Sequence, residues 1–514
     1  MAPIINVGAN CWDVASAEQT GLLIDGRNYY RAFYQAARAA KCYILISGWQ
    51  FDSDVTLVRG EDRADGDEVC LLSFLNGLCE KNKDLQIYIL AWNFNAVYGI
   101  DREWFQKWYF NWTTNDRLTF CFDDCHCMGA SHHQKFAVVD GTIAFVGGLD
   151  LCSSRWDDRD HCADNPQRVD ADHNPYTPFH DVQSYHVGAV AEKVAELFKQ
   201  RWKLACGKDL DLPEAIEKER IDFPESFPVL SSRVGISRTQ AKTDDGRQGS
   251  HQEIRQLFVS AIESAENLIY IENQYFSSNA LFRALSRRMT ASGRPPIEIV
   301  MILAKDANAF FEKISIGLMQ AKLIARLQEL ASKTGHKLGI YYPACLDANG
   351  QEVPTYIHAK FFLVDDRFLS VGSANMNNRS MGLDTEVNVA WEAAPEEHGT
   401  IDSIRRIRAD LLAEHTGTRD FATVHELTAV KGLVDFLERS AANASSRLRR
   451  HLCLDVDPAE YESLSSMFPD GFPFDMEQPE SENLIYETIS DQSGGLFAKG
   501  IASLKNIFKT ARTD

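Results

Sequence analysis

The chain contains the stretch His133-Gln134-Lys135-Phe136-Ala137-Val138-Val139-Asp140, and it repeats this pattern as His358-Ala359-Lys360-Phe361-Phe362-Leu363-Val364-Asp365. The second copy follows the first by 225 residues, the difference between positions 358 and 133. The same shift aligns Ile44-Leu45-Ile46 with Ile269-Tyr270-Ile271, and Val146-Gly147-Gly148 with Val371-Gly372-Ser373. Ungapped agreement over separated segments indicates an internal duplication. We therefore predict two similar halves, each of which contributes one His and one Lys.

Both copies of the motif lie in β-rich runs. Because residues i and i+2 of a strand point to the same face, each imidazole should project into one pocket together with its ammonium group. The Asp comes seven positions after the His, so in a regular strand it faces the other way. We therefore expect Asp140 and Asp365 to be structural, at the hairpin turns Asp140-Gly141 and Asp365-Asp366.

Two such motifs favour one shared site. An isolated His is more often structural than catalytic, but similar halves tend to pack about a pseudo-two-fold axis, which brings both pockets together. One neutral imidazole can then attack while the other, protonated, gives its proton to the leaving group. Two ammonium groups suit a phosphoryl centre, whose oxygens gain charge during the reaction. This chemistry needs no metal and no other cofactor.

The sequence resembles the phospholipase D superfamily from about residue 26 to about residue 392. The segments that carry the resemblance beyond the repeated motif are Gly147 to Cys152, Arg155 to Asp157, Phe179 to Val182, Gln200 to Trp202, Ile269 to Phe276 and Gly372 to Ser380. The string Ile271-Glu272-Asn273-Gln274-Tyr275-Phe276 is typical of phosphatidylcholine-type members. The resemblance implies two α/β/α sandwich halves packed face to face, with the site where they meet.

The resemblance also implies a role for each site residue. His133 would attack phosphorus and form a phosphohistidine, and His358 would protonate the departing alcohol and then activate water or another alcohol. The phosphate oxygens would be held by Lys135, Lys360 and Asn375, with Ser373 nearby and Gly148 and Asp150 at the equivalent positions of the first half. An unpaired Asp150 would repel an anion. Asp181 and Glu386 match the carboxylates that fix the tautomer of each His.

The composition bears on the partners of the protein. The formal net charge is −20, which argues against a nucleic-acid substrate and against strong attraction to anionic membranes. We expect the protein to bind peripherally to a phospholipid surface and to use water or a small alcohol as acceptor. The sequence does not indicate an oligomeric state. A monomer is sufficient for a complete site, because one chain carries both motifs.

The compartment follows from cysteine usage and from the N-terminus. The twelve cysteines show no pairing framework, so we expect reduced thiols. The chain begins without a recognisable secretory signal, and its apolar runs are too short to span a bilayer. These features predict a cytoplasmic protein. Export by a route without a cleavable signal would give the same pattern.

The order of expected elements predicts an α/β fold with a parallel or mixed sheet in each half. Residues 1–212 form the first half, 213–249 the connection, 250–440 the second half and 441–514 an appendage. The expected helices are Asn28–Lys41, Leu71–Lys81 and Gln252–Ser264. The expected strands are Cys42–Ile46, Leu85–Leu90, Leu268–Ile271 and Ile297–Leu303.

The last residues of the chain predict an amphipathic helix. Phe497, Ile501, Leu504 and Phe508 form an apolar stripe, and Lys499, Lys505, Lys509 and Arg512 lie off it. Such a helix could bind a membrane surface, or it could cover the protein's own core.

Two further clusters lie close to the first motif. Cys121, Cys125, His126 and Cys127 do not have the spacing of a usual zinc site. The stretch from Asp157 to His173 is rich in Asp and His but lacks the ligand spacing of calcium loops. We interpret this stretch as a surface loop at the lipid entrance.

The expected reaction is hydrolysis of a phosphatidylcholine-like glycerophospholipid to phosphatidic acid and the head alcohol, with transfer to small alcohols. One alternative is phosphatidyl transfer like that of cardiolipin synthases, which usually begin with membrane-spanning helices. Another is a non-catalytic lipid-binding scaffold, in which degenerate motifs would be expected. Both motifs are intact in this chain.

Overall fold

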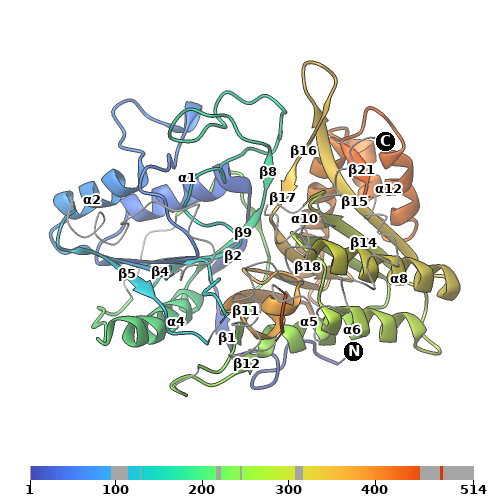
Figure 1. Cartoon of the computed structure of the whole chain (residues 1–514), viewed down its shortest axis with the longest axis horizontal. Coiled ribbons are helices and arrows are strands. Elements are labelled where there is room, and N and C mark those ends of the chain that lie inside the picture. Colours follow the sequence, from blue (N-terminus) through green and yellow to red (C-terminus); the bar gives the residue numbers. More distant parts are fainter. Residues whose placement is uncertain are drawn as a thin grey trace, which may run out of the picture.

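The computed structural model describes residues 2–93, 114–127, 129–215, 221–243, 246–306, 316–451 and 475–477. It contains two α/β halves, which lie side by side in Figure 1 and are coloured mainly blue to green and green to red. Each half is a mixed sheet with helices on both faces, which confirms the predicted fold class.

The first sheet has the strand order β10-β2-β9-β7-β6-β3-β4-β5. Its strands are β10 (Phe227–Pro228), β2 (Gln19–Ile24), β9 (Val182–Val187), β7 (Ile143–Gly147), β6 (Phe136–Val139), β3 (Tyr43–Gly48), β4 (Gln86–Trp92) and β5 (Leu118–Asp123). The strands β3, β4 and β5 are parallel, whereas β6, β7, β9 and β2 pair antiparallel.

Alternate side chains of β3 show why this sheet is covered on both faces. Ile44 and Ile46 pack with helices α1 (Asp25–Arg38) and α2 (Leu71–Lys81), whereas Leu45 packs on the side of α4 (Ala189–Cys206). The short 3₁₀ helix η1 (Gly60–Asp62) precedes α2. The predicted helices and strands of both halves are found within three residues of their expected ends.

The second sheet repeats the order of the first, as β1-β11-β20-β19-β18-β13-β14-β15, and continues into β16. Its strands are β1 (Asp13–Ser16), β11 (Arg233–Gln240), β20 (Glu386–Glu392), β19 (Phe368–Gly372), β18 (Lys360–Val364), β13 (Leu268–Asn273), β14 (Glu298–Leu303), β15 (Lys337–Leu346), β16 (Glu352–Pro354), β12 (His251–Gln252) and β21 (Leu448–Arg450). Its helices are α5 (Glu253–Ser264), α6 (Asn279–Thr290), α8 (Leu318–Thr334), α9 (Asn378–Gly382), α10 (His398–Thr416), α11 (Phe421–Leu427) and α12 (Leu433–Ala441).

The two halves exchange their edge strands. β1 precedes β2 in the chain but pairs with β11 of the second sheet, and β10 precedes β11 but pairs with β2 of the first sheet. Residues 213–249, which we expected to act only as a connection, therefore contribute one strand to each sheet. A loop prediction fails here because the partners of these strands lie in distant parts of the sequence.

The seam between the halves is also built from paired backbone. The strands β8 (Phe179–His180) and β17 (Tyr356–Ile357) form a separate two-stranded parallel sheet. At the position related to this sheet by the approximate two-fold symmetry, His132 forms a parallel β-bridge with Thr385. Each motif is thus bonded through its backbone to the opposite half.

Asp140 and Asp365 occupy equivalent turns and make equivalent contacts. The carboxylate of Asp140 accepts hydrogen bonds from the backbone N–H groups of residues 41, 42 and 43, at 2.8 Å each. That of Asp365 accepts from residues 266, 267 and 268, at 2.7 Å each, which are the same positions shifted by 225. The backbone is left-handed at Asp140, Gly141, Asp365 and Asp366, as two tight turns require.

Two expectations for loops and thiols are wrong. The stretch from Asp157 to His173 is not only a surface loop, because Asp157, His161 and Arg168 are buried. A disulfide joins Cys121 to Cys206, while nine other described cysteines form no disulfide. Cys121 lies in β5 and Cys206 is the last residue of α4, and these two elements pack together. The two cysteines are 85 residues apart, so the sequence did not indicate that they pair.

Some expectations concern residues that the structure does not describe. The amphipathic stripe from Phe497 to Phe508 and most of the appendage 441–514 lie outside the described residues. Within the described residues, no helix combines the length and apolar character needed to cross a bilayer.

We expect Asp140→Ala to lower the free energy of unfolding by roughly 2–4 kcal/mol, because three backbone donors lose a charged acceptor at once. Chemical denaturation would measure the loss. Asp209→Ala, which removes an exposed carboxylate paired with Lys203, is the matched control and should change stability little. Equal effects of the two substitutions would contradict the structural role of Asp140.

Candidate active site

Each motif histidine is paired with a carboxylate from the other half. Nδ1 of His133 lies 3.0 and 3.1 Å from the two carboxylate oxygens of Glu386. Nδ1 of His358 lies 2.6 Å from Oδ2 of Asp181. An Nδ1–H that donates to a carboxylate leaves Nε2 available for chemistry. Neither histidine would therefore be correctly oriented in an isolated half.

Backbone contacts across the seam place these pairs. The N–H of His133 donates to the carbonyl of Thr385, which directly precedes Glu386. In the same way, the N–H of His358 donates to the carbonyl of His180, which directly precedes Asp181. The two contacts between the halves are therefore equivalent. The same backbone hydrogen bonds that join the halves also orient both imidazoles.

Burial shifts the proton affinities of both pairs. The two carboxylates are fully buried, whereas the His133 and His358 side chains keep 16% and 11% of their surface exposed. Burial raises the pKa of Glu386 to about 8 and that of Asp181 to about 7. Burial and the nearby lysine ammonium groups hold the pKa of both histidines well below the usual value. Negative charge on a bound phosphate would act in the opposite direction and favour imidazolium.

The two lysines complete a cationic site around the histidines. Nζ of Lys135 lies 3.2 Å from Oδ2 of Asp150 and donates to the carbonyl of His133. Nζ of Lys360 donates to Oε1 of Gln274 at 3.1 Å and to the carbonyl of His358. Burial, together with the charge of Lys135, lowers the pKa of Lys360 to about 7.

Asp150 and Gly148 have roles other than the expected phosphate contact. The Asp150 carboxylate accepts from the N–H of Trp49 and is paired with Lys135, so it positions that lysine. A Cβ on Gly148 would lie 2.3 Å from Oδ1 of Asp181. Glycine therefore leaves room for the carboxylate that holds His358.

The equivalent positions of the second half also support a carboxylate. The hydroxyl of Ser373 donates to Oε2 of Glu386, and that of Ser380 donates to Oε1 at 2.7 Å. Asn375 is buried, and its side-chain oxygen has no hydrogen-bond partner among the described residues. A phosphate oxygen would have to accept from the Nδ2–H groups of Asn375, because the amide oxygen is itself an acceptor.

Sequence reasoning assigned no role to several residues beside the site. Phe179 and Tyr356 flank the imidazole of His358, with ring centroids 5.3 and 6.4 Å away. The guanidinium of Arg155 lies over the Phe179 ring, and its charge lowers the pKa of His358. The segments that carry the family resemblance contain three of these neighbours, Arg155, Gln274 and Ser380. Their place in those segments was the feature of the sequence that could have indicated a role in the site.

A buried support holds the first motif from behind. Gln134 lies between His133 and Lys135, and its side chain donates to the carbonyl of Glu386 and accepts from Arg201 on α4. Arg201 is itself paired with Asp123 at the end of β5. The Gln200-Arg201-Trp202 segment therefore acts through Arg201, which fixes the loop that carries the catalytic pair.

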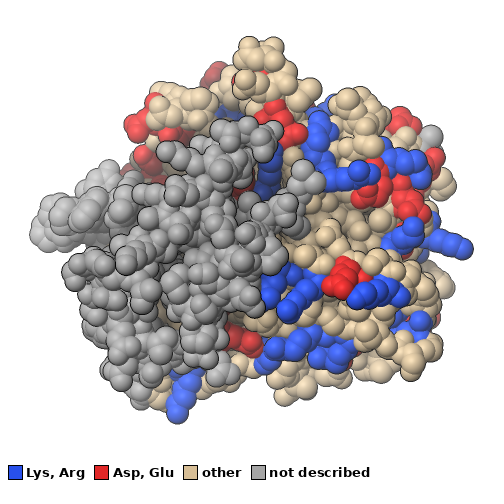
Figure 2. Space-filling model, turned by 45° about the vertical axis from the view of Figure 1, so that its right-hand side comes forward, with Lys and Arg blue, Asp and Glu red and all other residues tan. Residues whose placement is uncertain are grey.

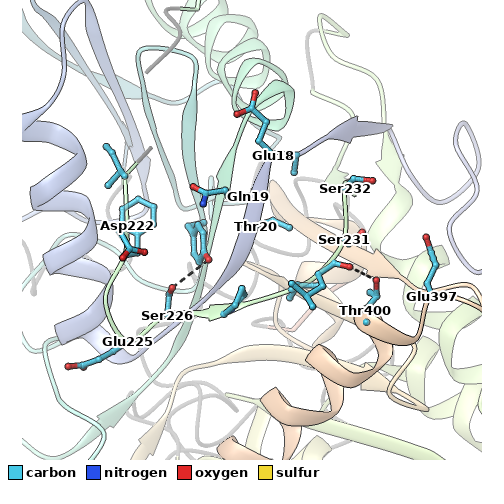
Figure 3. A pocket seen from close by; sticks show the side chains of 18 of the residues that line it. Glu18, Gln19, Thr20, Asp222, Glu225, Ser226, Ser231, Ser232, Glu397 and Thr400 are labelled. Carbon is cyan, nitrogen blue, oxygen red and sulfur yellow. Dashed lines mark hydrogen bonds between the residues drawn. The ribbon is translucent and has the colours of Figure 1, made fainter. Parts of the chain in front are cut away.

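A cavity lies at another place in the structure, away from the motif residues. It has a volume of 1040 Å³ and is lined by residues such as Glu18, Asp222, Glu225 and Glu397. Figure 3 shows these side chains around β2, the segment before β11 and the start of α10. No motif histidine or lysine lines it, so it is not the candidate active site.

Comparison with protein families agrees with the repeated motif. A model described as "Phospholipase D" matches residues 36–313, more than half of the chain. The chain belongs to the phospholipase D family. A second model, described as "Cardiolipin synthase, PLD-like domain", matches residues 258–406. The first match contains His133 and the second contains His358, which confirms the family expected from the sequence.

Relatives and solved structures extend this result. Phospholipase D alpha 1 of Ricinus communis is 23% identical over 535 residues, which cover 77% of this chain and 65% of the relative. Phospholipase D1 of Saccharomyces cerevisiae is 24% identical and is covered to 26% of its length. The chain thus spans less than two thirds of either relative. The crystal structure of phosphatidylserine synthase from Haemophilus influenzae Rd KW20 has a similar fold, with a TM-score of 0.53, 14% identity and coverage of 84% of this chain and 94% of that one.

The pKa of Lys360 leads to a binding experiment. Tungstate, an oxyanion that keeps its charge across the neutral range, should bind more weakly as the pH rises through about 7, because Lys360 then loses its positive charge. The dissociation constant should increase by up to about tenfold for each pH unit. Isothermal titration calorimetry would measure it. Lys360→Arg, which stays charged, should give a flatter profile, and identical profiles for both proteins would contradict the assignment.

Proposed function

We propose that the protein is a phospholipase D that cleaves the distal phosphodiester bond of glycerophospholipids. The observation that carries this proposal is the pair of histidines that are each held by a carboxylate of the opposite half, with two lysines beside them. Family membership supports a phosphodiesterase or phosphatidyltransferase. A phosphatidylcholine-like headgroup remains our first choice of substrate from the sequence resemblance.

In the first step, Nε2 of His133 attacks phosphorus as the bond from phosphorus to the headgroup oxygen breaks. The negative charge of the bound phosphate raises the pKa of His358, so that this ring is protonated in the complex. His358 then gives its proton to that oxygen and releases the head alcohol. Glu386 stabilises the positive charge that develops on the His133 ring. Lys135, Lys360 and the Asn375 amide stabilise the phosphoryl oxygens as they gain charge.

In the second step, the neutral His358 takes a proton from water, which attacks phosphorus. The bond between phosphorus and Nε2 of His133 breaks, and phosphatidic acid leaves. A small alcohol can replace water and gives the corresponding phosphatidyl alcohol. Asp181 keeps the His358 ring in place during both proton transfers.

The surface charges support a zwitterionic lipid surface rather than a polyanion. In the view of Figure 2, the Lys and Arg side chains that are drawn are interrupted by Asp and Glu. Among the described residues, Arg287 pairs with Glu263, Lys333 with Glu329 and Lys337 with Asp435. Such pairs leave little free positive charge for nucleic acid. Peripheral contact with a phospholipid membrane is therefore part of the proposal.

A phosphatidyltransferase that builds lipid is the second candidate. The match of residues 258–406 to the model described as "Cardiolipin synthase, PLD-like domain" supports it. The chemistry is the same up to the phosphohistidine, and only the acceptor differs. If the protein is such a transferase, transfer of the phosphatidyl group from the phosphohistidine to phosphatidylglycerol, supplied as the sole acceptor, would produce cardiolipin.

The central experiment mixes the full chain with labelled phosphatidylcholine vesicles and ethanol, without added metal ions. Phosphatidylethanol should form, because the covalent intermediate accepts either water or ethanol. His133→Ala and His358→Ala should each abolish it, as thin-layer chromatography of the lipids would show. His398→Ala, which removes an exposed histidine beside the cavity of Figure 3, should leave the rate unchanged. Turnover by either active-site variant would refute the mechanism.

Glu386→Gln should lower kcat by about 10²- to 10⁴-fold, because the carboxyl group can lose its proton as His133 becomes cationic and then stabilise the imidazolium, whereas the amide cannot. The lipid KM should change far less than kcat, since Glu386 is buried behind the histidine and does not reach the substrate. Glu397→Gln, at an exposed wall of the Figure 3 cavity, is the matched control. An unchanged kcat in Glu386→Gln would show that the hydrogen bond between His133 and Glu386 does not contribute to catalysis.

A further inference from the structure

A second buried cluster lies directly behind the carboxylate that holds His358. It consists of Asp25, His161 and His180 from the first half and Glu414 from α10 of the second half. All four are at most 8% exposed, and His180 precedes Asp181 in the chain. The proposed reaction uses none of them.

The imidazole nitrogens of this cluster face its carboxylate oxygens at short distances. Nε2 of His161 lies 3.4 Å from Oδ2 of Asp25 and 3.1 Å from Oε1 of Glu414. Nδ1 of His180 lies 2.9 Å from Oδ1 of Asp25 and 2.9 Å from the same Glu414 oxygen. One ligand atom of each residue lies within 4.8 Å of the other three, a spread that can close to the edges of about 3.3 Å expected of a tetrahedron whose metal–ligand bonds are about 2.0–2.1 Å.

Hydrogen bonds do not account for all of these short contacts. Nδ1 of His180 and Oδ2 of Asp25 are fully buried, yet neither makes a hydrogen bond of acceptable geometry among the described residues. A buried polar atom without a partner is unfavourable by about 1–3 kcal/mol. Both atoms lie beside other atoms of the cluster: Oδ2 of Asp25 is 3.4 Å from Nε2 of His161, and Nδ1 of His180 is 2.9 Å from Oδ1 of Asp25.

The outer contacts have the pattern found around metal-bound histidines. The other ring nitrogen of His161 lies 2.8 Å from Oδ2 of Asp157, and that of His180 lies 2.8 Å from Oε2 of Glu272. A metal-ligating histidine usually donates its second N–H to a carboxylate in this way. Glu272 is held in turn by His415 and by the Tyr270 hydroxyl, and the second oxygen of Glu414 accepts from Arg159.

We propose that Asp25, His161, His180 and Glu414 bind one zinc ion. Two imidazole nitrogens and two carboxylate oxygens in a four-coordinate arrangement suit zinc, whereas calcium and magnesium prefer six or more oxygen ligands. The divalent charge neutralises the two carboxylates. Since the protein fills all four positions, the ion is structural and takes no part in lipid chemistry, so this proposal is independent of the proposed function.

The ion joins elements that the active site needs together. Asp25 begins α1 with a left-handed backbone, and its N–H donates to the carbonyl of Asp181. His180 lies in β8, the strand that pairs with β17 directly before His358. Glu414 brings in α10 from the other half. Zinc thus fixes the position of Asp181 and ties the two halves together.

The test is elemental analysis of the full chain, purified without a metal-affinity step. The wild type should contain one zinc ion per chain. His161→Asn and Glu414→Gln should lose it, whereas His336→Asn, at a buried histidine between α6 and β15, should retain it. Removal of zinc with a strong chelator should lower Tm, and added zinc should restore it. Wild-type protein without zinc, whose Tm does not respond to added zinc, would overturn the proposal.

A measurement on the wild type covers the case in which the variants fail to fold. Protein produced with cobalt in place of zinc should show the visible absorption of tetrahedral Co²⁺ at one equivalent. Absence of that absorption would also overturn the proposal. Zinc retained in Glu414→Gln but lost in His415→Asn would do the same, because it would place the ion in the neighbouring group His180, Glu272 and His415.

Discussion

The hydrogen bond from each motif histidine to a carboxylate of the opposite half is the interaction on which the site depends. It fixes the tautomer of both rings, and it cannot form unless the halves are in register. The backbone bonds from His133 to Thr385 and from His358 to His180 set that register. Folding of the seam and assembly of the reactive groups are therefore a single event.

Duplication explains the shape of the site and also its asymmetry. The turn aspartates, the strand order and the crossed pairs follow the two-fold relation closely. The groups around the pairs do not. Glu386 accepts from two serine hydroxyls, whereas Gly148 leaves space for Asp181. Asp150 pairs with Lys135, but the side-chain oxygen of the equivalent Asn375 has no partner in the described part of the chain. Two nearly equal histidines thereby acquire different surroundings, which suits the different roles that we propose for them.

Much of the site was predictable from the sequence because its chemistry lies in short motifs. His133, Lys135, His358 and Lys360, together with Asp181 and Glu386, occupy the positions that the motifs and the resemblance indicated. The roles of Asp150 and Ser373 were not predictable, since each depends on a partner brought by the fold: Lys135 for one and Glu386 for the other. The buried face of the Asp157 to His173 segment was missed for the same reason, because its partners Asp25 and Glu414 are far away in the chain.

The sequence by itself determined the two halves, their α/β class and the four motif residues, because a repeat and a strand period are local properties of the chain. The tertiary structure alone decided which carboxylate serves which histidine, which edge strand completes which sheet, and which buried histidines gather behind Asp181. The histidine–carboxylate pairs join residues 253 and 177 positions apart, and both of these pairs cross the seam. Their geometry depends on how the two sheets meet, and no local pattern encodes that contact.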